Sequence, residues 1–430
     1  MRQFLYNARV IDPAQNLDMM GGMLIENGRI YAIDAKFTHK NAVRSAAQTI
    51  DCMGHILSPG LIDGRVHCRE PGEEHKESFA SASSAALSGG ITSFLQRPDT
   101  TPEIDGVSMV ERVANLGKIK NSVRIFPIAA LSQGLKGEKL TQFGLLQNAG
   151  AVGFSDADRP IKSTKLLRRA LSYAAAFDAL VIDLPQDQEF TDGGTMNAGA
   201  LATRLGLSGI PAFAEHLQVT RDLNLLESVP NAKLHLSLIT TRKAIDAIRT
   251  AKAQGLDVSC DTAPHYFRMN EGDIGDYRSF AKTFPPLRCE DDRNAVIEGL
   301  ADGTIDMVVS DHNPQDQESK RLPIEQAEFG VIGLQTLLPS ILHLVHDYNF
   351  SLVQALKLVT LTPAMRYGLN GGQLTKGAPA DLILINPDKG WKVKEHQLRS
   401  KSKNTAFEGQ LMQGEIVWSM VDGQTLYNAR

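Results

Sequence analysis

The side chains best suited to chemistry lie in one stretch, residues 57–72, which begins as an apolar strand and ends in a Pro-Gly turn. Residues two apart in a strand face the same side of it. If the strand stays regular, four polar side chains share one face: Asp63, Arg65, His67 and Arg69. A zinc site would need neutral imidazoles there, whereas arginine is always charged and has no lone pair to donate. A lone histidine such as His67 is more often a hydrogen-bonded core residue than a metal ligand.

The middle of the chain must position these residues, and it alternates short apolar strands with helical stretches. We expect eight strands, at residues 56–66, 91–95, 124–130, 151–155, 180–184, 233–239, 257–262 and 306–310. Helices are expected after most of them, for example at 78–87, 165–177, 241–253 and 294–301. This α/β pattern favours a (β/α)8 TIM barrel over residues 56–364, with its chemistry at the carboxyl ends of the strands. A doubly wound sheet is the alternative, disfavoured because no Gly-x-Gly-x-x-Gly follows the first strand.

Both ends of the chain show a different pattern, of short alternating strands. Asn27-Gly28 and Asp422-Gly423 stand between such strands and are strong hairpin-turn signals. We therefore predict that residues 1–55 and 365–430 together form one small β-sandwich domain beside the barrel.

Composition excludes several classes of function. The 430 residues are 42% apolar with a net charge of −4, so neither a nucleic-acid partner nor a membrane surface is expected. The basic residues at 394–403 are interpreted as a solvated face. The four cysteines form no Cys-x-x-Cys pair, and the first residues lack the charged head and long apolar core expected of a signal peptide. Since apolar runs also fall short of the roughly 18 residues that span a bilayer, we expect a cytoplasmic protein.

The strand ends and several connecting segments resemble the long-chain, class I type of dihydroorotase in the cyclic amidohydrolase superfamily. The resemblance spans nearly the whole chain and includes residues 193–211, 330–334 and 376–382. It implies a TIM barrel of the metal-dependent hydrolase type and a place in pyrimidine biosynthesis. In active members zinc activates a water that hydrolyses a ring amide C–N bond.

Three of the four metal histidines implied by the resemblance are replaced, and the residues now at those positions are Arg65, Leu184 and Leu238. The ligands that remain are His67, Asp156 and Asp311. This set is too small for two metals, so no metal and no other cofactor are expected. Only if the chain is active would these three residues hold zinc, with Asp311 as general base. A one-residue slip of its strand would bring Asp183 inward as a substitute ligand.

The substrate positions also depart from the family pattern. Asp99 stands where the family has an asparagine, which helps the arginine matching Arg69 to hold the substrate carboxylate. Phe284 replaces another asparagine that contacts substrate, and Gln315 replaces a loop histidine. The predicted site is therefore a vestigial pocket, formed by Arg65, His67, Arg69, Asp99, Asp156, His265 and Asp311.

These replacements predict a pseudo-enzyme, in which Arg65 supplies the charge of the missing metal and pairs with Asp156 or Asp311. The two leucines would fill the remaining space. Some members of the family are inactive chains that co-assemble with the catalytic subunit of aspartate transcarbamoylase, and the resemblance implies that partner here. Two alternatives stay open. One is an active cyclic amidohydrolase, either metal-free or with a rearranged metal site, to which Asp183, His235, His265 and His312 would contribute. The other is a small-molecule sensor that uses Arg69 and Lys282. Self-association is also left open.

Overall fold

The computed structural model describes residues 2–43, 46–119 and 122–429, and it confirms the predicted barrel. Hydrogen bonds connect its parallel strands in two runs, β6-β7-β8 and β9-β10-β11-β14-β15-β16, and β9 continues the line of β8. A parallel bridge between Val66 and His312 closes the ring. The strands are β6 (Leu61–Val66), β7 (Ile91–Gln96), β8 (Arg124–Pro127), β9 (Ala129–Ala130), β10 (Phe154–Ser155), β11 (Leu180–Asp183), β14 (Lys233–Leu236), β15 (Val258–Thr262) and β16 (Met307–Val308).

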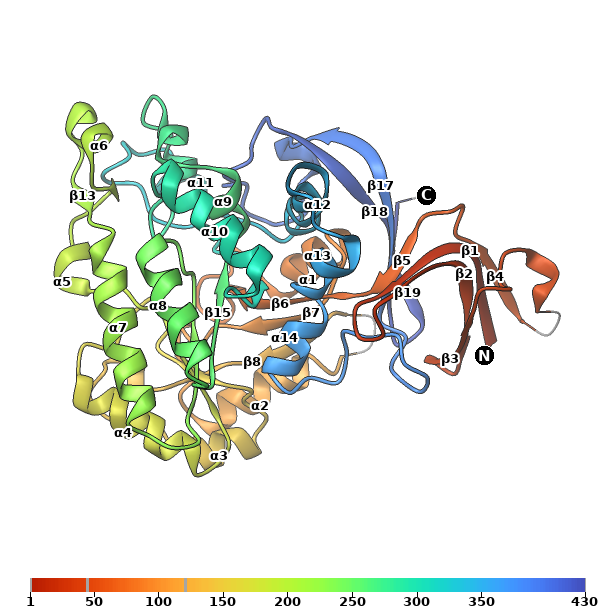
Figure 1. Cartoon of the computed structure of the whole chain (residues 1–430), viewed down its shortest axis with the longest axis horizontal. Helices are drawn as coiled ribbons and strands as arrows, with labels where there is room; N and C mark the ends of the chain where they lie inside the picture. Colours follow the sequence, from red (N-terminus) through yellow and green to blue (C-terminus); the bar gives the residue numbers. More distant parts are fainter. Residues whose placement is uncertain (1, 44–45, 120–121, 430) are drawn as a thin grey trace.

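Helices lie around the barrel strands (Figure 1). The four predicted helices are confirmed with shifts of a few residues at their ends, as α1 (Phe79–Ser88), α4 (Thr164–Ala175), α8 (Arg242–Ala253) and α10 (Glu290–Asp302). Further helices include α2 (Val107–Leu116), α7 (Phe213–Glu227), α12 (Leu337–Tyr348) and α14 (Leu361–Arg366). Among the described residues, no helix combines the length and the apolar character that a membrane span requires.

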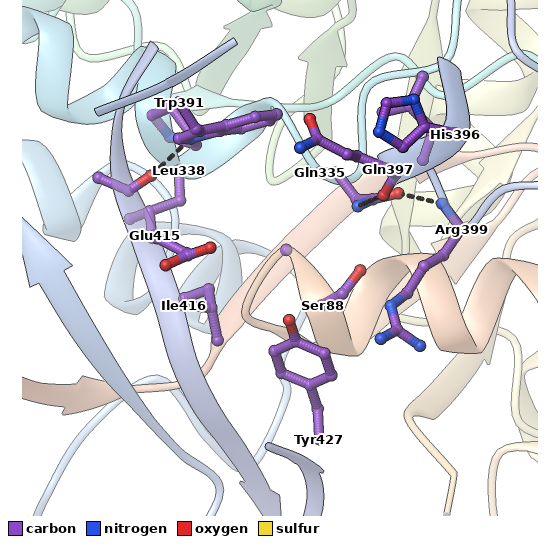
Figure 2. A pocket seen from close by; sticks show the side chains of 14 residues that line it. Ser88, Gln335, Leu338, Trp391, His396, Gln397, Arg399, Glu415, Ile416 and Tyr427 are labelled. Carbon is purple, nitrogen blue, oxygen red and sulfur yellow. Dashed lines mark hydrogen bonds between the residues drawn. The ribbon is translucent and has the colours of Figure 1, made fainter. Parts of the chain in front are cut away.

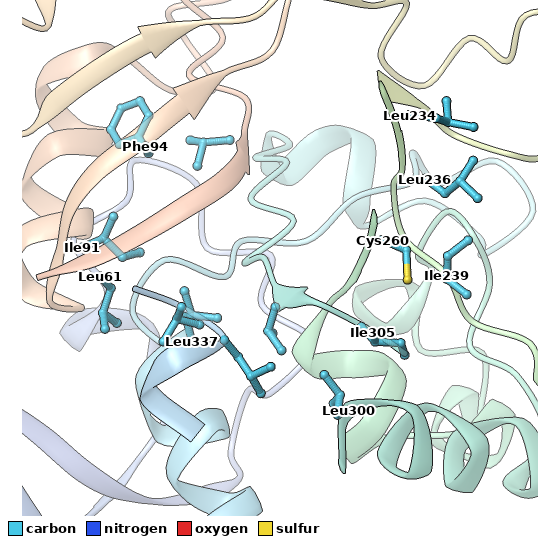
Figure 3. Packing of buried hydrophobic residues seen from close by; sticks show 14 of the residues in the cluster. Leu61, Ile91, Phe94, Leu234, Leu236, Ile239, Cys260, Leu300, Ile305 and Leu337 are labelled. Carbon is cyan, nitrogen blue, oxygen red and sulfur yellow. The ribbon is translucent and has the colours of Figure 1, made fainter. Parts of the chain in front are cut away.

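A continuous apolar core joins the barrel strands to the surrounding helices. Figure 3 shows side chains of this core from both sides of the barrel, including Leu61 of β6, Leu236 of β14 and Leu337 of α12. These three side chains are fully buried. Burial of this kind is the main favourable term in folding, so the barrel keeps its core although its polar centre departs from the family pattern.

The first predicted strand, 56–66, is wrong as a single element. Residues Ile56–Pro59 form β5, which pairs with β1 and β17 outside the barrel, and only β6 belongs to the barrel. The break falls at Gly60, where an added Cβ would lie 2.1 Å from the Thr92 hydroxyl. Glycine therefore allows the chain to pass close to β7 as it enters the barrel.

The strands from both ends of the chain come together, as predicted, but whereas the prediction was a β-sandwich, the hydrogen bonds of the described residues connect them in a single eight-stranded sheet. Its order is β19-β18-β17-β5-β1-β2-β3, with β4 also paired to β1, and it lies to one side of the barrel (Figure 1). Both predicted turns have the left-handed backbone of a hairpin, with φ of 51° and 77° at Asn27-Gly28 and 49° and 73° at Asp422-Gly423. The domain boundaries at residues 55 and 365 stay a prediction. The strands are β1 (Arg2–Asp12), β2 (Leu17–Glu26), β3 (Arg29–Asp34), β4 (Gln48–Asp51), β5, β17 (Leu382–Lys392), β18 (Leu411–Val421) and β19 (Gln424–Asn428).

Candidate functional site

Arg65, near the end of β6, lies at the centre of the barrel mouth and is 4% exposed. Its Nε donates to Oδ1 of Asp311 at 3.0 Å, so Arg65 pairs with the second of its two predicted partners, Asp156 and Asp311. Its Nη2 donates to a second carboxylate, that of Asp158, and its Nη1 donates to the Ser237 hydroxyl at 3.4 Å. The guanidinium is therefore held between two carboxylates from opposite sides of the barrel.

A second buried arginine lies beside the first. Arg97 follows β7, is 2% exposed, and donates two hydrogen bonds to Asp99 at 3.1 and 2.6 Å. It also donates to Asp158, which thereby joins Arg97 to Arg65. We call this set the arginine–aspartate cluster, and its members are Arg65, Arg97, Asp99, Asp158 and Asp311.

The cluster contains three carboxyl groups but only two guanidinium groups. The pKa values of the carboxyl groups reflect this excess of acidic groups. Burial opposes ionisation of Asp99 and Asp158, but the Arg97 guanidinium outweighs it and holds the pKa of both carboxyls below the usual range. Burial raises the pKa of Asp311 to about 7, although Arg65 acts in the opposite direction. Near neutral pH, the proton of the cluster is therefore held by its most buried carboxyl group.

Asp156 lies outside this cluster. It is 3% exposed and accepts hydrogen bonds from the backbone N–H of Ser132, at 2.9 Å, and from the Ser132 hydroxyl. Burial raises its pKa to about 6, and the neighbouring charge that adds to the rise is Asp183. Burial is thus the largest cause of the raised pKa at both Asp156 and Asp311.

His67 is buried, and both of its ring nitrogens are occupied. Its Nε2 donates to the backbone oxygen of Asp99 at 2.9 Å, and its Nδ1 accepts from the backbone N–H of Arg69 at 3.2 Å. A carbonyl can only accept and an amide can only donate, so these partners fix the tautomer. Burial lowers the pKa of His67 to about 4. The ring is therefore neutral, and it has no free lone pair for a metal.

The leucines at the other two histidine positions fill the centre with apolar side chains. Leu184 and Leu238 are 1% and 0% exposed and belong to one apolar cluster with Tyr266. The slip that would bring Asp183 inward is not present, because its carboxylate lies 3.4 Å from the Arg221 guanidinium on α7. No substitute ligand therefore comes from β11.

His265, after β15, faces Asp311 but is not bonded to it. Its Nε2 lies 3.7 Å from Oδ2 of Asp311 and has no hydrogen-bond partner among the described residues. The side chain is 1% exposed, and burial lowers its pKa to about 3. The imidazole is neutral, so it can accept a proton or a hydrogen bond but adds no charge to the cluster.

Arg69 does not share the face predicted for it, because β6 ends at Val66 and Arg69 has a left-handed φ of 57°. Its guanidinium donates to the backbone oxygen of Pro314 at 3.1 Å, to Glu73 at 2.6 Å and to the Asn313 side chain. These partners belong to the chain itself and occupy the group that would hold a substrate carboxylate.

Lys282 is likewise turned toward its own chain. Its ammonium donates to the backbone oxygens of Glu325 at 3.0 Å and Ala327 at 2.7 Å, and it lies 4.5 Å from the centre of the Phe329 ring. Phe329 also packs against Phe284, at 5.5 Å between ring centres, and its backbone oxygen accepts from the Gln315 amide at 2.9 Å. The substituted substrate positions thus anchor a loop rather than line an open pocket.

Comparisons with known proteins show the family to which this chain belongs. A family model described as dihydro-orotase-like matches residues 54–244. A protein named dihydroorotase from Pelobacter propionicus is 40% identical over 427 residues, which cover 99% of this chain and 100% of the relative. Another, from Anaplasma phagocytophilum, is 38% identical and covers 98% of this chain and 94% of its own length. The chain belongs to the dihydroorotase family.

Solved structures of hydantoinases have the same fold. The L-hydantoinase of Arthrobacter aurescens matches with a TM-score of 0.86 and 24% identity, over 99% of this chain and 96% of that one. A D-hydantoinase matches with a TM-score of 0.83 and 20% identity, over 100% and 95%. At this identity the likeness concerns the fold alone, and the amidohydrolase TIM barrel is confirmed.

The residues of this dihydroorotase-family chain do not fit a two-metal centre. The Asp311 carboxyl group accepts a hydrogen bond from Arg65, and that of Asp156 accepts one from Ser132. Both ring nitrogens of His67 are also hydrogen-bonded. In the part of the chain that the structure describes, no three histidine, cysteine or acidic side chains converge so that they could share a metal ion. A cation beside the metal position would also oppose binding by several kcal/mol at an intermediate dielectric.

Sequence reasoning missed two residues of the arginine–aspartate cluster, Arg97 and Asp158. Arg97 could have been predicted, because two arginines at the ends of neighbouring buried strands require carboxylates nearby. Asp158 gave no such signal, because it reaches the cluster only through the left-handed backbone of Ala157, with φ of 57°.

Proposed function

We propose that this chain is a non-catalytic member of the dihydroorotase family. The observation that carries the proposal is the Arg65 guanidinium, buried between Asp311 and Asp158 where family members hold metal. An arginine in this position supplies positive charge but cannot bind a water and lower its pKa. The carboxylate expected to act as general base is instead engaged by that arginine and keeps a proton near neutral pH.

We further propose that the chain acts in pyrimidine biosynthesis as a structural partner of the catalytic subunit of aspartate transcarbamoylase. Two things support this role: the resemblance to inactive family members that co-assemble with that subunit, and an intact barrel whose centre is filled by side chains. The sensor alternative is less well supported, because both Arg69 and Lys282 are held by groups of the chain itself.

The first test is the zinc content of the purified chain after incubation with zinc and dialysis. We expect less than about 0.1 equivalents per chain, because the remaining ligands are occupied. The Arg65→His variant should stay as free of zinc, since Leu184 and Leu238 still lack donor atoms. One or more tightly held equivalents in the unaltered chain, or zinc gained by Arg65→His alone, would contradict the proposal.

The second test concerns the partner and the activity together. Mixed with the catalytic subunit of aspartate transcarbamoylase from the same organism, the chain should elute with it in one earlier peak on size exclusion. Hydrolysis of dihydroorotate should stay at the level of the buffer, with and without added zinc. Separate elution would exclude the partner. Zinc-dependent turnover would favour the competing function, an active cyclic amidohydrolase with a rearranged metal site and Asp311 as general base.

A further inference from the structure

A cavity of about 380 Å³ lies where the barrel meets the terminal sheet, and it shares no residue with the arginine–aspartate cluster (Figure 2). The end of α1 and the start of α12 supply its barrel side, and β17, β18 and β19 supply its sheet side. The volume falls at the lower end of the range of small-molecule pockets, roughly 300–1,000 Å³. The ligand that it suits is therefore small.

Hydrogen bonds within the chain fix the walls of this cavity. The Trp391 indole N–H donates to the backbone oxygen of Gly414 at 3.0 Å, which holds the ring in place. The Gln335 amide donates to the backbone oxygen of Gln397 at 3.2 Å, and its Oε1 accepts from the backbone N–H of Arg399 at 2.5 Å. The cavity is thus formed before any ligand enters, which lowers the entropy cost of binding.

The charges that line the cavity are one cation and one anion. Figure 2 shows Glu415 on one side of the space and Arg399 on the other, with Trp391 above and Tyr427 below. The Arg399 guanidinium lies 5.0 Å from the centre of the Tyr427 ring. Among the described residues, neither of the two charged groups forms an ion pair within the chain. Both are free to bind the opposite charges of one ligand.

The apolar part of the lining is buried. Leu338 of α12 and Ile416 of β18 are 1% and 3% exposed and lie beside the two aromatic rings. Aromatic groups pack well against such surfaces, in offset-stacked or edge-to-face geometry. The lining therefore combines an apolar slot with two opposite charges.

We propose that this cavity binds a small zwitterion, an α-amino acid with an aromatic side chain. The ligand carboxylate binds Arg399, its ammonium binds Glu415, and its ring packs between Trp391 and the apolar floor. Both polar contacts are charge-assisted hydrogen bonds, which are stronger than neutral ones. The inference is independent of the proposed function, because the cavity and the metal position lie in separate parts of the fold.

The probe for this site is L-phenylalanine, titrated into the full chain by calorimetry. Fluorescence gives a second readout, since the chain has two tryptophans and only Trp391 lines the cavity. Binding should be saturable and should change the Trp391 emission. 3-Phenylpropanoate lacks the ammonium and 2-phenylethylamine lacks the carboxylate, so each should bind at least about tenfold more weakly.

Two variants test the assignment of the charges. Glu415→Gln and Arg399→Gln should each weaken L-phenylalanine binding about tenfold or more. Glu111→Gln and Arg112→Gln change the same charges on the exposed face of α2, far from the lining, and should leave binding unchanged. The proposal is overturned if L-phenylalanine does not bind saturably at millimolar concentration, if the singly charged analogues bind as well, or if the four variants behave alike.

Discussion

Replacing Arg65 by methionine is expected to lower the free energy of unfolding by about 3–5 kcal/mol. Methionine retains an unbranched apolar chain but has neither the charge nor the donors of arginine. The Arg65 side chain is 5% exposed, and the Asp311 side chain beside it is 6% exposed, so water cannot replace the lost guanidinium. A buried carboxylate is then left without its cation, and Asp158 retains only Arg97.

Urea unfolding at pH 8 measures this effect, because Asp311, with a pKa of about 7, is mostly ionised there in the unaltered chain. Arg249→Met is the matched control. Arg249 also lies between two carboxylates, those of Asp246 and Asp302, but its side chain is 41% exposed. Exposed ion pairs contribute about 0–1 kcal/mol, so the control variant should be nearly as stable as the unaltered chain.

Equal losses in Arg65→Met and Arg249→Met would show that Arg65 does not hold the barrel mouth together. A large loss confined to Arg65→Met would instead identify this arginine as the structural replacement for the metal. The distinction matters for function, because a cation that stabilises the fold cannot be displaced by zinc without a cost of several kcal/mol.

The sequence was sufficient to predict the barrel and one contact of its centre. The apolar strands and the turns at Asn27-Gly28 and Asp422-Gly423 are local signals, and local signals survive in the fold. The pairing of Arg65 with Asp311 was predictable because the first and the eighth strand of a closed barrel are neighbours. Opposite charges at the ends of neighbouring strands, both buried, have few other partners.

The remaining contacts depend on backbone geometry that the pattern of apolar and polar residues does not predict. Arg69 and Ala157 both have left-handed φ values of 57°, which turn one side chain out of the expected face and bring Asp158 into the cluster. The serine that bonds Asp156 lies 24 residues earlier in the chain. Non-glycine residues with such φ values are uncommon, so alternation along a strand could not predict these positions.

The second large effect is expected for the Asp311→Asn variant. This variant should lack the part of the pH dependence of stability that Asp311 causes. Burial raises the pKa of this carboxyl group from 3.8 to about 7. The folded chain therefore binds a proton that the unfolded chain releases above pH 3.8. The stability that Asp311 contributes is fully present below pH 3.8 and is lost as the pH rises through 7. A shift of about three pKa units corresponds to a loss on the order of 4 kcal/mol.

Other buried groups also titrate in this range, so the measured quantity is the difference between the two chains at each pH. Burial raises the pKa of Asp63 to about 6, which gives the same sign as Asp311. Burial lowers the pKa of His67 and His265 to about 4 and 3, so their contribution is present above pH 6.5 and is lost on acidification. The terms of Asp63 and His67 are common to both chains and cancel in the difference, whereas His265, 3.7 Å from Asp311, is titrated separately in each chain.

The free energy of unfolding is measured at intervals between pH 4 and pH 8 for both chains. The difference between Asp311→Asn and the unaltered chain should change in one direction as the pH rises. Relative to the unaltered chain, Asp311→Asn should gain stability steadily up to about pH 7 and no further. Asp158→Asn is the control with the opposite sign, because the pKa of Asp158 is held below 3.8 by Arg97 and Arg65 against the effect of burial. That variant should be less stable than the unaltered chain by a nearly constant amount between pH 4 and pH 8, because the contribution of Asp158 is lost only as the pH falls below 3.8. If both variants showed the same dependence on pH, the proton would not belong to Asp311, and a carboxylate able to act as general base would remain beside His265.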